Sequence, residues 1–135
     1  MEDLKIQEVD SDNEEFTSFF KEKEQDIEQY FPHYSEEDAE RGFVLILRVE
    51  ETVIGAFVYQ TKGQEVHIDL DYVIPNFRDK GIGMQLFEQK TADFERTGFK
   101  TMITLTDNPA HINYITKLGF QNTEIHPDRY EKQIN

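Results

Sequence analysis

One short segment, residues 73–83, constrains the fold more than any other part of the chain. It reads Val-Ile-Pro-Asn-Phe-Arg-Asp-Lys-Gly-Ile-Gly, with an alternating strand pattern before it and a helical pattern after it. Its two glycines permit a tight backbone turn from the strand into the helix. The unbonded N–H groups of the first helical turn then face outward, where they can hold a phosphate or pyrophosphate. The segment therefore predicts an anion-binding turn in an α/β protein.

Two well-known phosphate-binding motifs do not fit this turn. The Gly-Lys-Ser/Thr of a P-loop is absent, and a dinucleotide fingerprint needs glycine at the position of Leu86. A strand-to-helix connection without any ligand is the alternative, and Gly-x-Gly alone does not decide between them. Arg78 and Lys80 add positive charge to the turn in an otherwise acidic protein.

Composition excludes several classes of function. The 135 residues include no cysteine, which excludes disulfides, a thiolate nucleophile and cysteine-held metal centres. The chain holds 14 Lys and Arg against 28 Asp and Glu, a net charge of −14, which disfavours nucleic-acid binding. No apolar run approaches the roughly 18 residues of a membrane span. The acidic start at Met1 lacks the basic and apolar parts of a signal peptide. We expect one cytoplasmic domain over residues 1–135, without membrane contact.

The acidic charge is concentrated near the N-terminus. Residues 1–40 hold 15 acids and 3 bases, a net charge of −12, whereas residues 41–135 hold 13 and 11, a net charge of −2. Solvated helix faces explain most such charge runs. The alternative is that this region attracts a cationic partner.

Periodicity predicts one mixed, mostly antiparallel sheet flanked by helices. The expected strands cover residues 5–9, 43–49, 53–60, 65–74, 100–106 and 128–134. The expected helices cover residues 16–31 and 35–41, a segment from 84 that stops at Gly98, and one from Pro109 that stops at Gly119. Ser11 with Glu14 predicts a capping box for the first helix, and Asn108 a cap for the last.

Two motifs carry a family resemblance. Val73-x-Pro75-x-x-Arg78-x-x-Gly81-x-Gly83 resembles motif A of the GCN5-related N-acetyltransferases (GNAT), and Asn108 followed by Lys117-Leu118-Gly119-Phe120 resembles their motif B. The expected order of strands and helices agrees over nearly the whole chain. The resemblance implies the acyl-CoA N-acyltransferase fold and an enzyme that moves the acetyl group of acetyl-CoA to a primary amine.

The resemblance also implies where acetyl-CoA binds. Backbone N–H groups of the turn would hold the pyrophosphate, the exposed backbone of the fourth strand would pair with the pantetheine, and two side chains would approach the rest of the molecule. By position, these residues are Tyr72, Val73, Ile74, Arg78, Asp79, Lys80, Gly81, Ile82, Gly83, Met84, Asn108 and Lys117. Asn108 as a simple helix cap and Lys117 as a solvated cation are the structural alternatives.

For the base that deprotonates the amine, the resemblance implies His67 and Asp69 on the fourth strand. Strict alternation places His67, Asp69 and Asp71 on one face, about 6.6 Å apart, and Ile68 and Leu70 on the other, together with Tyr72 and Ile74. Histidine titrates near neutrality and suits this role, whereas Asp71 is expected to be an ordinary polar surface residue. One imidazole and two carboxylates along a single strand chelate a metal poorly, so no metal site is expected.

The chain departs from the family pattern at the residue that would protonate the leaving thiolate. The usual tyrosine position holds Ile115, and the adjacent Tyr114 is rotated by about 100° around the helix. Tyr114, Tyr130, water or no dedicated acid are the alternatives. His33, His111 and His126 are expected to lie on the surface or in packing rather than in the chemistry.

Two rival functions remain at this stage. The substitution at Ile115 favours a CoA-binding module that has lost catalysis, acting as a sensor or partner. An acidic interaction protein indifferent to CoA is the second rival, and Arg78, Gly81 and Gly83 argue against it. The acceptor is a small-molecule or protein amine, cationic if the acidic N-terminal region binds it. Homodimers are common among relatives, and the sequence does not decide whether this chain forms one.

Overall fold

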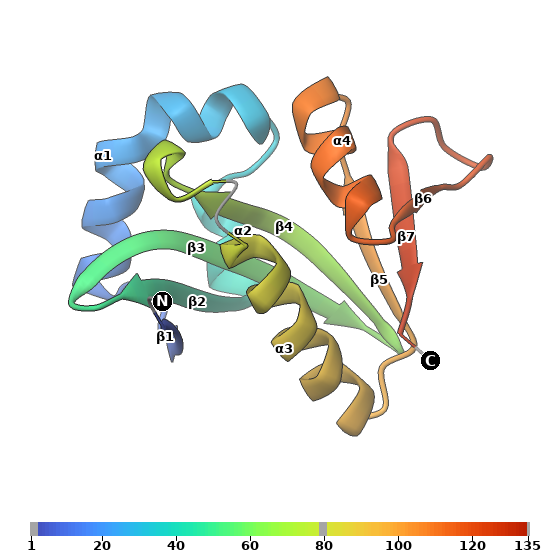
Figure 1. Ribbon diagram of the computed structural model, residues 1–135, viewed down its shortest axis with the longest axis horizontal. Helices are drawn as coiled ribbons and strands as arrows, with labels where there is room; N and C mark the ends of the chain where they lie inside the picture. Colours follow the sequence, from blue (N-terminus) through green and yellow to red (C-terminus); the bar gives the residue numbers. More distant parts are fainter. Residues whose placement is uncertain (1–2, 79–80, 135) are drawn as a thin grey trace.

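The computed structural model describes residues 3–78 and 81–134 and contains one seven-stranded sheet. The strand order is β1-β2-β3-β4-β5-β7-β6 (Figure 1), with β4 and β5 parallel and every other pair antiparallel. The strands are β1 Leu4–Val9, β2 Phe43–Val49, β3 Thr52–Lys62, β4 Glu65–Val73, β5 Thr101–Leu105, β6 Gln121–Asn122 and β7 Arg129–Gln133. The predicted mixed, mostly antiparallel sheet is confirmed, and β6 is an addition to it.

Helices cover both faces of this sheet (Figure 1). They are α1 Glu14–Tyr30, α2 Glu36–Arg41, α3 Ile82–Arg96 and α4 Pro109–Lys117, with a 3-10 turn, η1, at Pro75–Phe77. One apolar core lies between the sheet and α1 and α2, and includes Phe19 and Leu70. The other lies between the sheet and α3 and α4, and includes Phe87 and Ile68. The described helices include none long and apolar enough to cross a bilayer.

The helix caps agree with the sequence at one end of the chain and not at the other. Asn108 caps α4, its Oδ1 accepting the backbone N–H of His111 at 3.1 Å, as predicted. The predicted cap at Ser11 is wrong, because Asn13 caps α1 and its Oδ1 accepts the N–H of Phe16 at 3.0 Å. Ser11 instead lies in the turn that leaves β1.

A β-bulge at Asp69 interrupts the alternation of β4. Tyr59 of β3 pairs with Ile68, and the preceding Val58 pairs with Leu70, so Asp69 is an extra residue. As a result, Ile68 belongs to the core under α3 and α4, and Leu70 to the core under α1 and α2. The prediction of strict alternation along this strand is therefore wrong.

The bulge also marks the place where β4 leaves β5. The two strands pair only from Glu65 to Ile68, opposite Thr101 to Thr104. Beyond Ile68, β4 keeps its pairing with β3 on one side and diverges from β5 on the other (Figure 1). The second half of β4 thus has one edge free of sheet pairing, which is the kind of edge an extended ligand can pair with.

Candidate active site

The turn into α3 has the geometry of an anion site. Gly81 lies at the N-cap in the left-handed conformation, with φ of 78°, which a side-chain-bearing residue rarely adopts. The helical ladder starts with the N–H of Gln85 donating to the carbonyl of Gly81 at 3.0 Å. The N–H groups of Ile82, Gly83 and Met84 precede that bond and have no acceptor within the helix. Their dipoles and the absence of a Gly83 side chain suit a phosphate group.

Arg78 does not contribute a free charge to this turn. Its Nη2 donates to Asp26 of α1 and its Nε to the carbonyl of Val73, both at 2.7 Å. Its guanidinium also lies over the ring of Tyr30, 4.9 Å from the centroid. The expected cationic role of Arg78 is corrected by this arrangement, because the charge is compensated by Asp26 and fastens the turn to α1. Asp79 and Lys80 lie outside the described residues.

A cavity of about 350 Å³ opens beside this turn, between the free edge of β4 and α4, and we call it the turn cavity. Tyr72, Val73, Arg78, Gly83, Tyr114 and Lys117, all predicted site residues, line it. It also includes Asp71 and His111, which the sequence had left without a role. The turn cavity therefore combines the glycine turn, the free strand edge and the helix of motif B.

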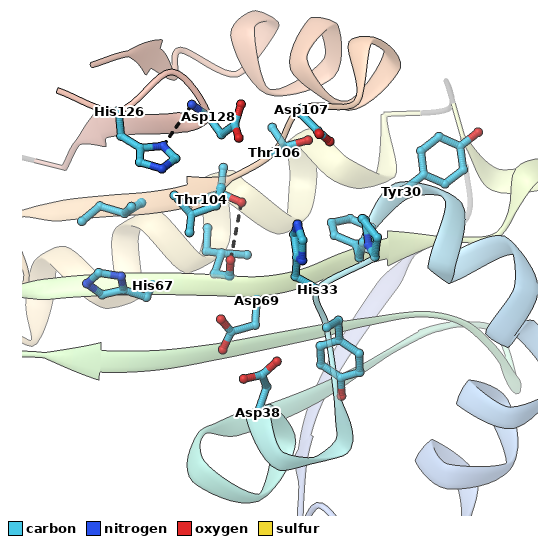
Figure 2. Close-up of a pocket in the computed structure, with 16 residues that line it drawn as sticks. Tyr30, His33, Asp38, His67, Asp69, Thr104, Thr106, Asp107, His126 and Asp128 are labelled. Carbon is cyan, nitrogen blue, oxygen red and sulfur yellow. Dashed lines mark hydrogen bonds between the residues drawn. The ribbon is translucent and has the colours of Figure 1, made fainter. Parts of the chain in front are cut away.

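A second cavity, of about 380 Å³, lies at the bulge, and we call it the acidic cavity (Figure 2). Its lining comes from the end of α1, the α1–α2 loop, α2, β4, β5 and the residues just after it, and the loop before β7. Four carboxylates line it, those of Asp38, Asp69, Asp107 and Asp128, together with the imidazoles of His33, His67 and His126. The described lining includes no Lys or Arg. Tyr30 and Phe31 border both cavities, so the two meet at the end of α1.

His67 and Asp69 lie together in the acidic cavity, as the sequence predicted. Nε2 of His67 lies 3.0 Å from Oε1 of Glu65, and within the described residues Nδ1 has no bonded partner. Asp69 accepts from Nε2 of Gln60 at 2.7 Å. Burial, together with the charge of nearby Asp38, raises the pKa of Asp69 above its ordinary value. The imidazole is thus held at one nitrogen and available at the other.

Asp71 lies on the opposite face from His67, which corrects the prediction that they share one. Its Oδ1 lies 2.9 Å from Nε2 of His111 on α4, and the side chains are only 2% and 4% exposed. Asp71 is therefore no surface residue. Burial alone would lower the pKa of His111, but the charge and hydrogen bond of Asp71 outweigh it, and the pKa is raised. The bulge is the physical reason, because one extra residue turns every later side chain over.

The positions considered for the acid that protonates the leaving thiol lie in different parts of the structure. Ile115 is fully buried in the core. Tyr114 packs on Phe87 at 6.4 Å between ring centroids, and its hydroxyl fills the space that a Gly83 side chain would need. Burial holds the pKa of Tyr114 far above its ordinary value. Tyr130 lies on β7, outside the described lining of both cavities.

The remaining predicted residues are less directly placed. Asn108 lines neither cavity, since its Oδ1 caps α4 and its Nδ2 donates to the carbonyl of Gln29 at 3.2 Å. Ile74, Ile82 and Met84 also lie outside the described lining. A pantetheine contact of Asn108 stays a prediction. No group of three or more His, Asp or Glu with metal-binding geometry occurs in the described residues.

Three residues of the site, Glu65, Asp71 and His111, received no role from the sequence. Glu65 could have been found, because it precedes His67 by two positions on a strand and so shares its face. The Asp71–His111 pair could not, because its two members are 40 residues apart and the bulge that joins them has no clear sequence signal.

Comparison with known proteins agrees with this geometry. The model of the Acetyltransferase (GNAT) family matches residues 6–120. Among solved structures, GCN5 of Tetrahymena has a TM-score of 0.75 at 14% identity, covering 98% of this chain and 96% of that one. A Bacillus subtilis acetyltransferase in complex with CoA has a TM-score of 0.70 at 20% identity, covering 96% of each chain.

The ribosomal-protein-S18-alanine N-acetyltransferase of Escherichia coli has a TM-score of 0.68 at 17% identity, covering 98% of this chain and 95% of that one. These identities are low enough that the likeness concerns the fold alone. No curated protein matches the sequence significantly. The family match spans most of the chain, and the turn, the bulge and the free edge of β4 agree with it. The chain therefore belongs to the GNAT acetyltransferase family.

Proposed function

We propose that this protein transfers the acetyl group of acetyl-CoA to a primary amine that carries additional positive charge. The observation that carries the proposal is the pair of cavities that meet at Tyr30 and Phe31. One has the phosphate turn and a free strand edge, and the other has carboxylates and an imidazole. This division suits a reaction between an anionic thioester and a cationic amine.

In the turn cavity, acetyl-CoA would lie along the free edge of β4. The N–H groups of Ile82, Gly83 and Met84 would hold the pyrophosphate, and the backbone of Tyr72 and Val73 would pair with the pantetheine. A Bacillus subtilis relative and a Thermoplasma acidophilum relative were both solved in complex with CoA, which supports an acyl-CoA ligand.

In the acidic cavity, His67 would take the proton of the attacking amine. The carboxylate of Glu65 fixes one nitrogen of the ring, and the other faces no described partner. An amine must lose its proton to attack a carbonyl carbon, and a positioned imidazole can accept that proton. A backbone N–H of β4 near the bulge would polarise the thioester carbonyl. Asp69 would add negative charge beside the ammonium group.

The lining of the acidic cavity favours a cationic acceptor. Four carboxylates line this cavity, without a Lys or Arg among the described lining residues, and the carboxylates of Asp38 and Asp69 face each other (Figure 2). Carboxylates of one sign in a concave site attract ligands of the opposite sign. A diamine places its second ammonium group among these carboxylates while its first amine reacts.

Calorimetric titration with acetyl-CoA, followed by thiol release with a panel of amines, tests the proposal. We expect micromolar binding, and faster release with 1,4-diaminobutane than with 4-aminobutanol, by about 10-fold in kcat/KM at low salt. Absence of CoA binding would contradict the proposal entirely. Binding without thiol release for any amine would indicate a CoA-binding module. If the preference for the diamine did not depend on salt, only the proposal of a cationic acceptor would be contradicted.

A further inference from the structure

The buried pair of Asp71 and His111 joins β4 to α4 across the turn cavity. Nε2 of His111 lies 2.9 Å from Oδ1 of Asp71, and both side chains are at least 96% buried. An ion pair at this depth is costly to assemble from water, and it is weak evidence for stability alone. Its place among the residues that line the turn cavity suggests a chemical role.

The second ring nitrogen of His111 has no protein partner. Nδ1 is buried and is one of the few buried polar atoms without a hydrogen bond in the described residues. Buried polar atoms are almost always bonded, so an orphan of this kind calls for an explanation, and a catalytic role is one. When Asp71 holds Nε2, the Nδ1 of a protonated ring is an N–H donor that still lacks an acceptor.

Other residues near His111 are poorly suited to donate a proton in this cavity. Tyr114 stacks beside it, 6.2 Å between ring centroids, but its hydroxyl is packed against Gly83. From α1, the uncharged ring of Phe31 contacts His111 edge-on at 4.9 Å. Asp71 of β4 is the one charged partner recorded for the ring in the described residues.

We propose that His111, held by Asp71, is a catalytic acid that gives its Nδ1 proton to the sulfur of CoA as the acetyl group leaves. This role rests on the function proposed above. The amine nitrogen bonds to the carbonyl carbon, the carbon–sulfur bond breaks with its electron pair on sulfur, and the Nδ1 proton joins that sulfur. His67 takes the proton of the amine and returns it to solvent, and His111 recovers one from solvent. The net products are the amide and free CoA.

The charge balance of the pair supports this direction of transfer. Asp71 raises the pKa of His111, so more of the ring is protonated near neutral pH than in an ordinary histidine. A protonated ring beside the sulfur also favours the thiolate, as it does in cysteine–histidine pairs. Asp71 is then a positioning residue, because it acts through His111.

The bound product offers a test that needs no amine. The thiol of CoA is titrated by its ultraviolet absorbance in complex with the wild-type protein, His111→Gln and Asp71→Asn. We expect the bound thiol to titrate at lower pH than free CoA in the wild type, and to lose that shift in both variants. Thr116→Ala, an exposed change on the same helix, is the matched control and should keep the shift. Asp71→Asn keeps nearly the same shape and carries the test if His111→Gln fails to fold.

Kinetics separate this inference from the proposed function. We expect His111→Gln to lower kcat by about 100-fold, with CoA affinity within twofold, and to lose the alkaline limb of the kcat profile. Asp71→Asn should move that limb to lower pH. The acid role alone would be overturned if the thiol of CoA bound to the wild type titrated as in free CoA. An unchanged pH profile of kcat in His111→Gln would overturn it as well. Wild-type protein that binds CoA but acetylates no amine would overturn the proposed function and the acid role together.

Discussion

The two halves of β4 differ although they belong to one strand. Before the bulge, Glu65 to Ile68 pair on both sides, and His67 points toward the α1–α2 side. After it, Leu70 to Val73 pair with β3 alone, and Asp71 points toward α4. One inserted residue, Asp69, therefore places the side chains of His67 and Asp71 in two different cavities. The comparison shows how one strand can present polar side chains to two cavities, which under the proposed function would hold the amine and the thioester.

The largest expected effect comes from the half before the bulge. His67→Ala should lower kcat/KM for acetyl transfer by about 1000-fold at pH 7, because the amine then lacks a base. CoA affinity should stay within twofold, since His67 lies outside the lining of the turn cavity. The measurement is a pH–rate profile beside calorimetry. Glu65→Gln is the matched change, and it should lower kcat/KM by about 10-fold because the His67 ring is no longer held. An unaltered pH–rate profile in His67→Ala would show that His67 is not the base.

The half after the bulge should control stability. Asp71→Ala should cost about 3 kcal/mol of unfolding free energy, because it removes one partner of a buried pair. Chemical denaturation at pH 6 measures this loss, and Asp69→Ala, half-buried on the other face, should cost less. A loss in Asp71→Ala no greater than in Asp69→Ala would contradict the different roles assigned to the two halves.

The same pair gives the protein a pH-dependent stability. The pKa of His111 is raised in the folded state from its ordinary value of about 6.5. A raised pKa means that the folded protein binds the proton more tightly, so the pair stabilises fully below pH 6.5 and loses this contribution as pH rises through the folded pKa. Unfolding free energies from pH 5.5 to 9 should show this decline in the wild type. Asp71→Asn should flatten this decline in stability. An equal decline in that variant would mean that another titratable group causes it.

A smaller effect is expected in the turn cavity. Gly83→Ala should weaken CoA binding by about 30-fold, because the new methyl group overlaps the Tyr114 hydroxyl and displaces the first turn of α3. Calorimetry measures the loss. Gln89→Ala, exposed on the same helix, is the control, and adding Tyr114→Ala to Gly83→Ala should recover part of the affinity. Full CoA affinity in Gly83→Ala would argue against a pyrophosphate at this turn.

The smallest expected effect concerns the negative charge of the acidic cavity. Asp38→Asn should raise KM for 1,4-diaminobutane by about threefold at low salt and leave 4-aminobutanol unchanged. The amide oxygen can still accept the Ser35 N–H, which Oδ2 of Asp38 accepts at 3.0 Å, so the α2 start is retained. An equal change for both acceptors would indicate a structural effect rather than a charge preference.

Much of the fold could be predicted from the sequence, because its signals are local. The Phe43–Val49 strand, the Asn108 cap and the glycine turn each depend on neighbouring residues, and the structure confirms them. The site was only partly predictable. His67 and Asp69 were placed together correctly, whereas the bond from the Arg78 side chain to Asp26 of another helix was not foreseen. Contacts between distant segments have no local signal.

The sequence by itself determined the class of this protein: the two motifs and the order of strands and helices mark an acetyltransferase of the GNAT family. It also determined where the acidic charge lies along the chain. Only the tertiary structure decided which carboxylates lie together, and of the four in the acidic cavity only Asp38 belongs to residues 1–40. A one-residue bulge in β4 sends Asp71 to His111 and leaves Asp69 with Asp38 in the acidic cavity. The physical reason is that a strand's side chains alternate, so one added residue exchanges the faces of all that follow.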